Sequence, residues 1–294
     1  MGGVWEDSLF LCPSTVVGFA FAAKRWGRMY VDKFQPIEFD DMAYEGLVLD
    51  EDTKDMIKGL VQHGVGSGIK DLISGKGVGT IFLLHGNPGM GKTLTAEAVA
   101  ELLHKPLYSV TVGELGTDAS TLEYQLSDVL KIASSWKAVL LLDEADVFLE
   151  RRNSADVHRN AMVGIFLRLL EYHQGILFLT TNRIASFDPA FASRINVALK
   201  YDDLQVAART TIWRRCLQNV CGAESTEFSD SDLANLAAAE LNGRQIRSIV
   251  KTAKCIATSK GVELGMRHVN IVLGVADKFT RDLKKAEEEA KQVV

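Results

Sequence analysis

A glycine-rich stretch followed by lysine and threonine is the first feature of the sequence that could do chemistry. It has the pattern G-x-x-x-x-G-K-T and lies between a short apolar run, residues 80–85, and a segment of helical character, residues 92–103. Glycines here let successive backbone N–H groups turn toward a phosphate, and the following helix adds a partial positive charge. Lys92 then reaches the β- and γ-phosphates of a nucleoside triphosphate, and the Thr93 hydroxyl is a ligand for Mg²⁺. The pattern predicts these nucleotide-binding residues: Gly86, Asn87, Pro88, Gly89, Met90, Gly91, Lys92, Thr93 and Leu94.

Two adjacent carboxylates, Asp143 and Glu144, follow the apolar run 138–142. At the end of a strand, Asp143 can orient Mg²⁺, and Glu144 can polarise the water that attacks the γ-phosphate. This pairing is typical of a hydrolase, and the sequence lacks the Asn-Lys-x-Asp motif with which a GTPase reads its base. Carboxylates that cap a following helix are the alternative interpretation, which applies to Asp146 but explains the adjacent pair poorly.

A third apolar run, residues 175–181, ends in Asn182. An Asn at the carboxyl end of a central strand is placed to hold the attacking water or to contact the γ-phosphate. Alone, such an Asn is more often part of a turn. The order of the three motifs along the chain makes the functional interpretation the stronger one.

The elements that must position these residues alternate between apolar runs and helical stretches from residue 80 to residue 201, the pattern of a parallel sheet covered by helices. This predicts an α/β fold, the αβα sandwich of P-loop NTPases with a five-stranded parallel sheet, followed by a small all-helical lid domain. We expect residues 1–50 to be a collar or linker, residues 51–201 the α/β domain, and residues 202–294 the helical domain. The predicted strands are 80–85, 106–112, 138–143, 175–181 and 195–200, and the predicted helices are 92–103, 119–135, 156–173, 203–220, 230–240, 243–260 and one from residue 266. We further expect a flexible connection over the glycine-rich residues 64–79 and a frayed, charged tail from Arg281.

Composition limits the partners and the compartment. With 33 Lys and Arg against 38 Asp and Glu, the net charge of −5 argues against nucleic acid as a partner. No apolar run reaches the roughly 18 residues of a membrane span, and Glu6 and Asp7 precede the apolar stretch 9–23 where a secretory signal carries positive charge. The four cysteines have no C-x-x-C spacing, so we expect free thiols and an intracellular, reducing compartment, the cytoplasm or nucleus.

Over about residues 50–275 the chain resembles the AAA+ ATPases, and specifically the AAA family. The likeness is carried by GNPGMGKT, LLLDEAD and TTNRIASFDPAFASRI, and it is strongest toward a fungal subgroup in which a comparable core follows a separate upstream module. The resemblance implies Walker A, Walker B and sensor 1 roles for the three segments, with ATP and Mg²⁺ as cofactors. It also implies a ring, usually a hexamer, with active sites between subunits.

The same resemblance implies roles for arginines. Arg194 corresponds to an arginine finger that acts on a neighbouring subunit's nucleotide, although the family's longer run ending in Gly-Arg-Phe-Asp is shortened here. Arg244 corresponds to the sensor 2 position and could reach the γ-phosphate. For each, an ordinary surface arginine is the alternative, and Arg151 and Arg152 could be intersubunit contacts or solvated side chains.

One departure from the family concerns the loop over residues 112–120, where threading members carry an aromatic residue that grips extended polypeptide. No aromatic residue occurs here before Tyr124. This puts threading of unfolded polypeptide in doubt but not the remodelling of a folded partner, and the leading hypothesis is an oligomeric ATPase that remodels a protein partner. The alternative is a slow nucleotide-dependent switch or scaffold without threading activity, and a clamp-loader-like action on DNA is disfavoured by the acidic charge balance.

Overall fold

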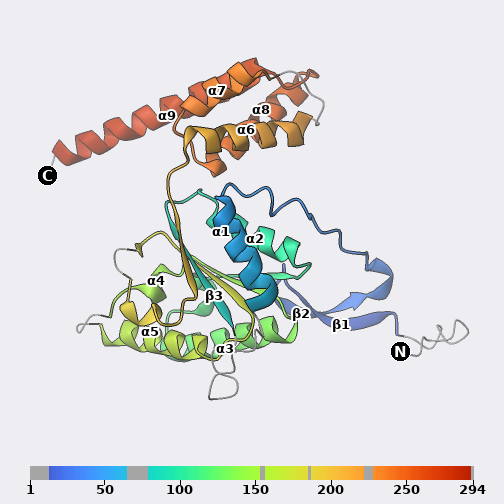
Figure 1. Cartoon of the computed structure of the whole chain (residues 1–294), viewed down its shortest axis with the longest axis vertical. Helices are drawn as coiled ribbons and strands as arrows, with labels where there is room; N and C mark the ends of the chain where they lie inside the picture. Colours follow the sequence, from blue (N-terminus) through green and yellow to red (C-terminus); the bar gives the residue numbers. More distant parts are fainter. Residues whose placement is uncertain (1–12, 65–78, 153–155, 185–186, 222–227, 293–294) are drawn as a thin grey trace, which may run out of the picture. The chain divides into compact units, whose positions relative to one another are not determined.

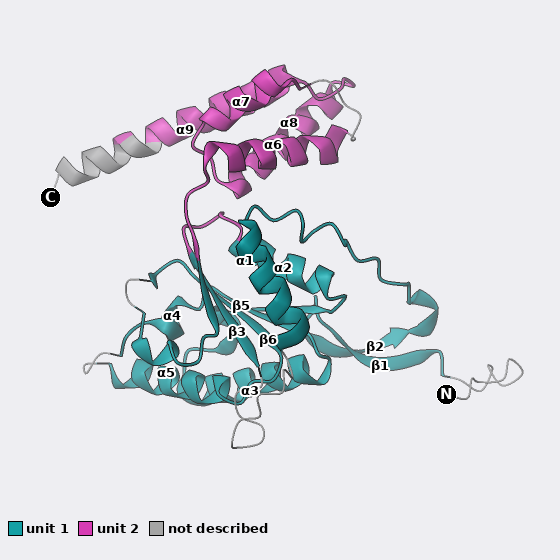
Figure 2. Cartoon of the chain, viewed as in Figure 1, with its two compact units in different colours: residues 1–85, 92–199 teal, residues 86–91, 200–294 magenta. Residues whose placement is uncertain are grey.

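The computed structural model describes residues 13–64, 79–152, 156–184, 187–221 and 228–292. The predicted flexible connection at 64–79 lies almost wholly outside the described residues. Contacts divide the chain into two compact units, one of residues 1–85 and 92–199 and one of residues 86–91 and 200–294 (Figure 2). The sequence analysis placed residues 86–91 within the α/β domain, whereas their contacts group them with the helical unit.

A five-stranded sheet with the order β4-β5-β6-β3-β7 is the centre of the first unit (Figure 1). The αβα sandwich with a five-stranded parallel sheet is thereby confirmed. The strands are β3 (Thr80–Gly86), β4 (Leu107–Thr111), β5 (Val139–Asp143), β6 (Ile176–Thr181) and β7 (Val197–Tyr201). The helices of this unit include α1 (Glu51–Gly59), α2 (Lys92–Leu102), α3 (Ala119–Ser135), α4 (Asp146–Leu149) and α5 (Val157–Leu170).

The central strands are apolar along their length because helices cover both faces of the sheet. Figure 1 shows α3 and α5 along one face and α1 and α2 on the other. Alternate residues of β3 face opposite layers: Leu83 joins the cluster that contains Leu126 of α3 and Phe166 of α5, while Phe82 stacks on Phe178 with ring centroids 4.7 Å apart. These buried side chains hold the strands in one register.

That register brings the polar ends of four strands to one edge of the sheet. β4 pairs with β5 so that Thr111 lies opposite Asp143, and β6 pairs with β3 so that Thr181 lies opposite His85. The carboxyl ends of parallel strands meet at a common edge, which is where ligands bind in this fold class. Residues from three distant motifs are thus collected at one place.

The described part of the amino-terminal segment forms a β-hairpin, β1 (Thr15–Ala20) and β2 (Arg25–Tyr30). Phe19 is 7% exposed and packs edge-on against Tyr108 of β4. Lys24, in the hairpin turn, forms an ion pair of 2.7 Å with Glu114. We expected a collar or linker here and no strands, because the aromatic residues that anchor the hairpin have irregular spacing in the sequence.

The described residues of the second unit form the helices α6 (Val206–Cys221), α7 (Asp230–Ala238), α8 (Gly243–Ser259) and α9 (Met266–Gln292). Trp213 is fully buried among them, and α8 turns an apolar face that includes Ile246 and Val250 toward this core. α9 remains helical to Gln292, where we expected fraying from Arg281; its Lys, Glu and Ala residues are strong helix formers. None of the helices in the described ranges combines the length and the apolar character that crossing a bilayer requires.

Candidate functional site

The glycine-rich loop adopts a conformation that only glycine tolerates. Gly86 has a φ of 138°, and a Cβ there would lie 2.2 Å from the carbonyl oxygen of Tyr201. Gly89 has a φ of 80°, and a Cβ there would lie 2.7 Å from the side chain of Asn242. Both values lie in the left-handed region, which side chains with a Cβ rarely adopt. Glycine at these two positions therefore lets the loop curl tightly, as a phosphate-binding loop requires.

Lys92 and Thr93 begin α2 and contact two of the other predicted residues. The Lys92 ammonium donates a hydrogen bond of 2.8 Å to Oδ1 of Asn182, and the Lys92 residue is only 8% exposed. The Thr93 hydroxyl lies 3.3 Å from Oδ1 of Asp143. Residues from three separate motifs are thus within hydrogen-bond distance of each other, at the edge where a γ-phosphate and its metal would lie.

Glu144 lies beside this cluster in a strained backbone conformation. Its φ is 56°, which is uncommon for a residue with a side chain and costs on the order of 1–3 kcal/mol. Thr180 supports it: the Glu144 N–H donates to the Thr180 hydroxyl at 2.9 Å, and that hydroxyl donates to Asp143. Sequence reasoning missed Thr180, although two threonines at the end of an otherwise apolar strand were a visible signal.

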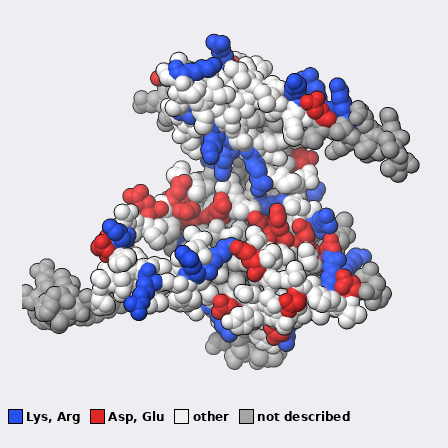
Figure 3. All heavy atoms as spheres, turned by 180° about the vertical axis from the view of Figure 1, so that it is seen from behind, with Lys and Arg blue, Asp and Glu red and all other residues white. Residues whose placement is uncertain are grey.

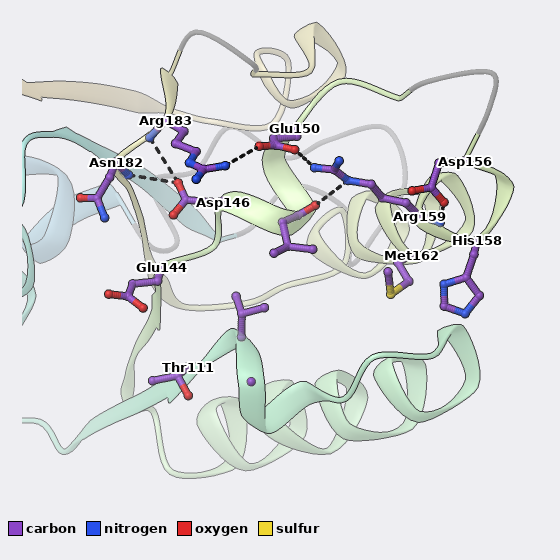
Figure 4. A pocket seen from close by; sticks show the side chains of 13 residues that line it. Thr111, Glu144, Asp146, Glu150, Asp156, His158, Arg159, Met162, Asn182 and Arg183 are labelled. Carbon is purple, nitrogen blue, oxygen red and sulfur yellow. Dashed lines mark hydrogen bonds and ion pairs between the residues drawn. The ribbon is translucent and has the colours of Figure 1, made fainter. Parts of the chain in front are cut away.

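A hollow of about 990 Å³ opens next to Glu144 and Asn182, both of which are exposed (Figure 4). Its wall comes from the ends of β4, β5 and β6 and from α4 and α5. Four carboxylates and two arginines line it: Glu144, Asp146, Glu150, Asp156, Arg159 and Arg183. The Glu144 carboxylate is therefore open to solvent beside the Asn182 side chain.

The donor set at Thr93 and Asp143 fits Mg²⁺. A hydroxyl and a carboxylate oxygen are hard ligands, and Mg²⁺ usually takes one or two such protein groups together with phosphate oxygens and waters. Among the described residues, no group of three or more His, Cys, Asp or Glu side chains could hold a metal by itself. A site of this kind binds its metal together with the nucleotide.

The structure does not bring Arg194 to this cluster. Its guanidinium forms an ion pair with Glu171 and donates a hydrogen bond of 2.7 Å to the carbonyl of Ala190. The role of Arg194 toward a neighbouring subunit stays a prediction.

Arg151 and Arg152 also have partners within the chain. Arg152 forms an ion pair of 2.9 Å with Asp188, and Arg151 donates to the carbonyl of Phe187 at 3.3 Å. Burial would raise the pKa of Asp188, but hydrogen bonds from Ala190 and Arg152 lower it below its usual value. Both arginines thus fasten the segment that follows Asn182.

Arg244 belongs to the second unit, where it is exposed in the first turn of α8. The start of this helix contacts the glycine-rich loop, because the Gly243 N–H donates to the Gly89 carbonyl at 3.1 Å. Asn87 of the loop donates to Asp203 at 2.8 Å. These contacts explain why the loop groups with the helical unit, and a role for Arg244 at the γ-phosphate stays a prediction.

Comparison with known proteins gives one family and several relatives. Residues 82–202 match the family described as "ATPase family associated with various cellular activities (AAA)". The chain is 32% identical over 155 residues to human ATPase family AAA domain-containing protein 3B, covering 50% of this chain and 24% of that protein. It is 32% identical over 126 residues to the probable mitochondrial chaperone bcs1 of Schizosaccharomyces pombe, covering 40% and 27%. It is 26% identical over 248 residues to the ATP-dependent zinc metalloprotease FtsH of Aquifex aeolicus, covering 74% and 37%. The chain thus spans about a quarter to a third of the length of these relatives.

Proposed function

Because this chain is an AAA+ ATPase with its AAA domain at residues 82–202, we propose that the whole protein is a magnesium-dependent ATPase that works as a ring of identical subunits and remodels a protein partner. The ATPase class rests on the family match. The ring, the metal and the partner are the parts proposed here.

One observation carries the catalytic part of the proposal, the convergence of Lys92, Thr93, Asp143 and Asn182 at one edge of the sheet. Lys92 neutralises charge on the β- and γ-phosphates, and Asn182, which Lys92 contacts, orients the attacking water. Glu144 accepts the proton of that water as it attacks. Thr93 and Asp143 would hold Mg²⁺, which neutralises the phosphate oxygens during the transfer.

The ring is inferred from the family resemblance, which assigns Arg194 to a neighbouring subunit's nucleotide. The partners of Arg194 are Glu171 and neighbouring residues of its own segment, and none of the interactions described for it reaches Lys92, Glu144 or Asn182. An arginine that completes a site in another copy of the chain needs no contact with its own. The family resemblance adds the expectation of a hexamer.

A protein partner is supported by the relatives, whose names include a chaperone and a protease. On the face in Figure 3, basic side chains lie in small groups among acidic ones, which is a poor surface for a phosphate backbone. The compartment stays a prediction, since the fission yeast relative is named as mitochondrial.

A slow switch or scaffold is the second candidate, and the loop after β4 favours it. Val112–Leu115 is a short 3₁₀ turn without an aromatic residue, fixed by reciprocal hydrogen bonds between Thr111 and Glu114. Lys24 holds Glu114 from the hairpin. A turn tied down in this way is poorly suited to gripping moving polypeptide.

The ATPase rate per subunit, measured against protein concentration, tests the proposal. In a ring the rate rises with concentration in the wild type and stays low in Arg194→Ala. Arg168→Ala is the matched control, since it removes an exposed arginine that pairs with Glu123 at 2.7 Å. A rate that is flat with concentration and unchanged in Arg194→Ala would remove the ring.

Glu144→Gln separates the remodelling enzyme from the switch. It keeps the size of the side chain but cannot accept a proton, so turnover falls by about 100-fold or more while ATP still binds. A remodelling enzyme then retains its partner in the presence of ATP, and the partner can be recovered with the variant. Under the switch hypothesis, partner binding changes little.

A further inference from the structure

We propose that Asp146 is a positioning residue for hydrolysis, which holds the Asn182 backbone so that the Asn182 side chain meets the γ-phosphate and the attacking water. This inference rests on the proposed ATPase function. It assigns a role to a carboxylate that lies three residues beyond Asp143 and is otherwise accounted for only as a helix cap.

The hydrogen bonds of Asp146 point to the end of β6. Its Oδ1 accepts from the backbone N–H of Asn182 at 3.1 Å and of Arg183 at 3.2 Å (Figure 4). It also accepts from the Thr181 hydroxyl, and Thr181 is 1% exposed. A single carboxylate oxygen thus gathers three donors from three consecutive residues.

The helix-cap explanation does not account for these contacts. Ala145 is the capping residue of α4 and makes no side-chain cap. The Asp146 side chain turns away from its own helix and binds the neighbouring strand end. Beyond the end of β6, the backbone N–H groups no longer pair with a neighbouring strand. The Asp146 carboxylate accepts their hydrogen bonds instead.

Holding this backbone fixes the side chain that meets the nucleotide. Asn182 accepts a hydrogen bond of 2.8 Å from Lys92, so its amide is in reach of the same phosphate. Thr180 forms a second tie between the same two strand ends, through Asp143 and the Glu144 N–H. Asp146 and Thr180 thus hold the end of β6, and the Asn182 side chain projects from this fixed backbone.

Arg183, the next residue, is held by a further contact. Its guanidinium lies 3.6 Å from Glu150, which also pairs with Arg159 of α5 (Figure 4). Independently of this side-chain pair, the Arg183 N–H is shared between Asp146 Oδ1 at 3.2 Å and the Thr181 hydroxyl at 2.9 Å. Removal of the Asp146 carboxylate alone should therefore loosen Asn182 without dissolving the rest of the network.

A double-mutant cycle on the full chain tests the proposal by ATPase kinetics. Asp146→Ala lowers kcat by about 10- to 100-fold with little change in KM for ATP, the range for loss of a group that orients a catalytic residue. Because Asp146 acts through Asn182, the double variant with Asn182→Ala stays within about threefold of Asn182→Ala alone. Asp146→Asn keeps an acceptor oxygen and restores most of the rate. If kcat of the double variant instead fell by the product of the two single losses, the two residues would act independently and the proposal would be overturned.

Asp156→Ala is the matched control. It also removes a carboxylate from the wall of the hollow, but one that caps α5 by accepting from the Arg159 N–H at 2.9 Å. Its kcat stays within about threefold of the wild type. An equal loss of kcat in Asp146→Ala and Asp156→Ala would show that the effect comes from the charge in the hollow, and it would contradict the positioning role.

Hydrogen–deuterium exchange in the nucleotide-free protein gives a readout that does not depend on turnover. The backbone N–H of Asn182, whose acceptor is Asp146, exchanges at least about tenfold faster in Asp146→Ala than in the wild type, and its exchange is unchanged in Asp156→Ala. Unaltered exchange in Asp146→Ala overturns the inference even if the wild type hydrolyses ATP. Absence of ATPase activity in the wild type, with the exchange change present, refutes the proposed function instead.

Discussion

Acidification should destabilise the first unit through one buried histidine. His173 lies between α5 and β6 and is 4% exposed, and neither of its ring nitrogens has a hydrogen-bond partner among the described residues. Burial lowers its pKa from 6.5 to about 4, because the charged imidazolium would lose its water without gaining a partner. The folded protein therefore keeps His173 neutral at a pH where the unfolded chain binds a proton.

The sign and size follow from linkage. Below pH 6.5 the unfolded state binds more protons than the folded state, so stability is lost as pH falls from about 6.5 toward about 4. At pH 5.5 the imidazole of the unfolded chain is protonated about ten to one. This lowers the free energy of unfolding by about 1.4 kcal/mol relative to pH 7.5. Since pH 5.5 is above the folded pKa of about 4, this cost depends almost only on the unfolded chain.

Urea unfolding followed by tryptophan fluorescence at pH 7.5 and 5.5 measures the effect. We compare the wild type with His173→Leu, and use His63→Leu, which removes an exposed imidazole, as the matched control. The loss of stability between the two pH values should be about 1.4 kcal/mol smaller in His173→Leu than in the wild type. Equal losses in the wild type and His173→Leu would refute the argument from burial.

Three further changes test the site and the core. Lys92→Ala should weaken binding of Mg²⁺ and ATP by about 10- to 100-fold in calorimetry, because a charged hydrogen bond to phosphate is lost; unchanged affinity would contradict its role. Gly86→Ala should also weaken binding, since its Cβ would lie 2.2 Å from the Tyr201 carbonyl, whereas Gly113→Ala meets no atom within 4 Å and serves as the control. Phe178→Ala should cost about 3–5 kcal/mol in urea unfolding, as a fully buried ring on the central strand β6 leaves a cavity; a loss below about 1 kcal/mol would place it outside the core.

Much of the fold was predictable because the central strands are apolar throughout and the helices between them are periodic. The predicted strand 138–143 is β5 at Val139–Asp143, and the predicted helix 119–135 is α3 at Ala119–Ser135. The β1–β2 hairpin was missed, since it packs on residues that are far away in sequence, such as Tyr108 of β4, which contacts Phe19. Contacts between residues so far apart in sequence do not produce a hydrophobic periodicity within the segment, so the strands could not be predicted from it.

The sequence by itself identified the groups that we propose meet the triphosphate. Local chemistry sufficed for Lys92, Asp143 and Glu144, because glycine, lysine and carboxylates at these spacings next to apolar runs have few other uses. Only the tertiary structure decided how these groups are held: the left-handed backbone of Glu144, the support from Thr180 and the clasp of Asp146 on the end of β6. Those contacts depend on the register between β5 and β6, which packing of the whole sheet sets and no single segment encodes.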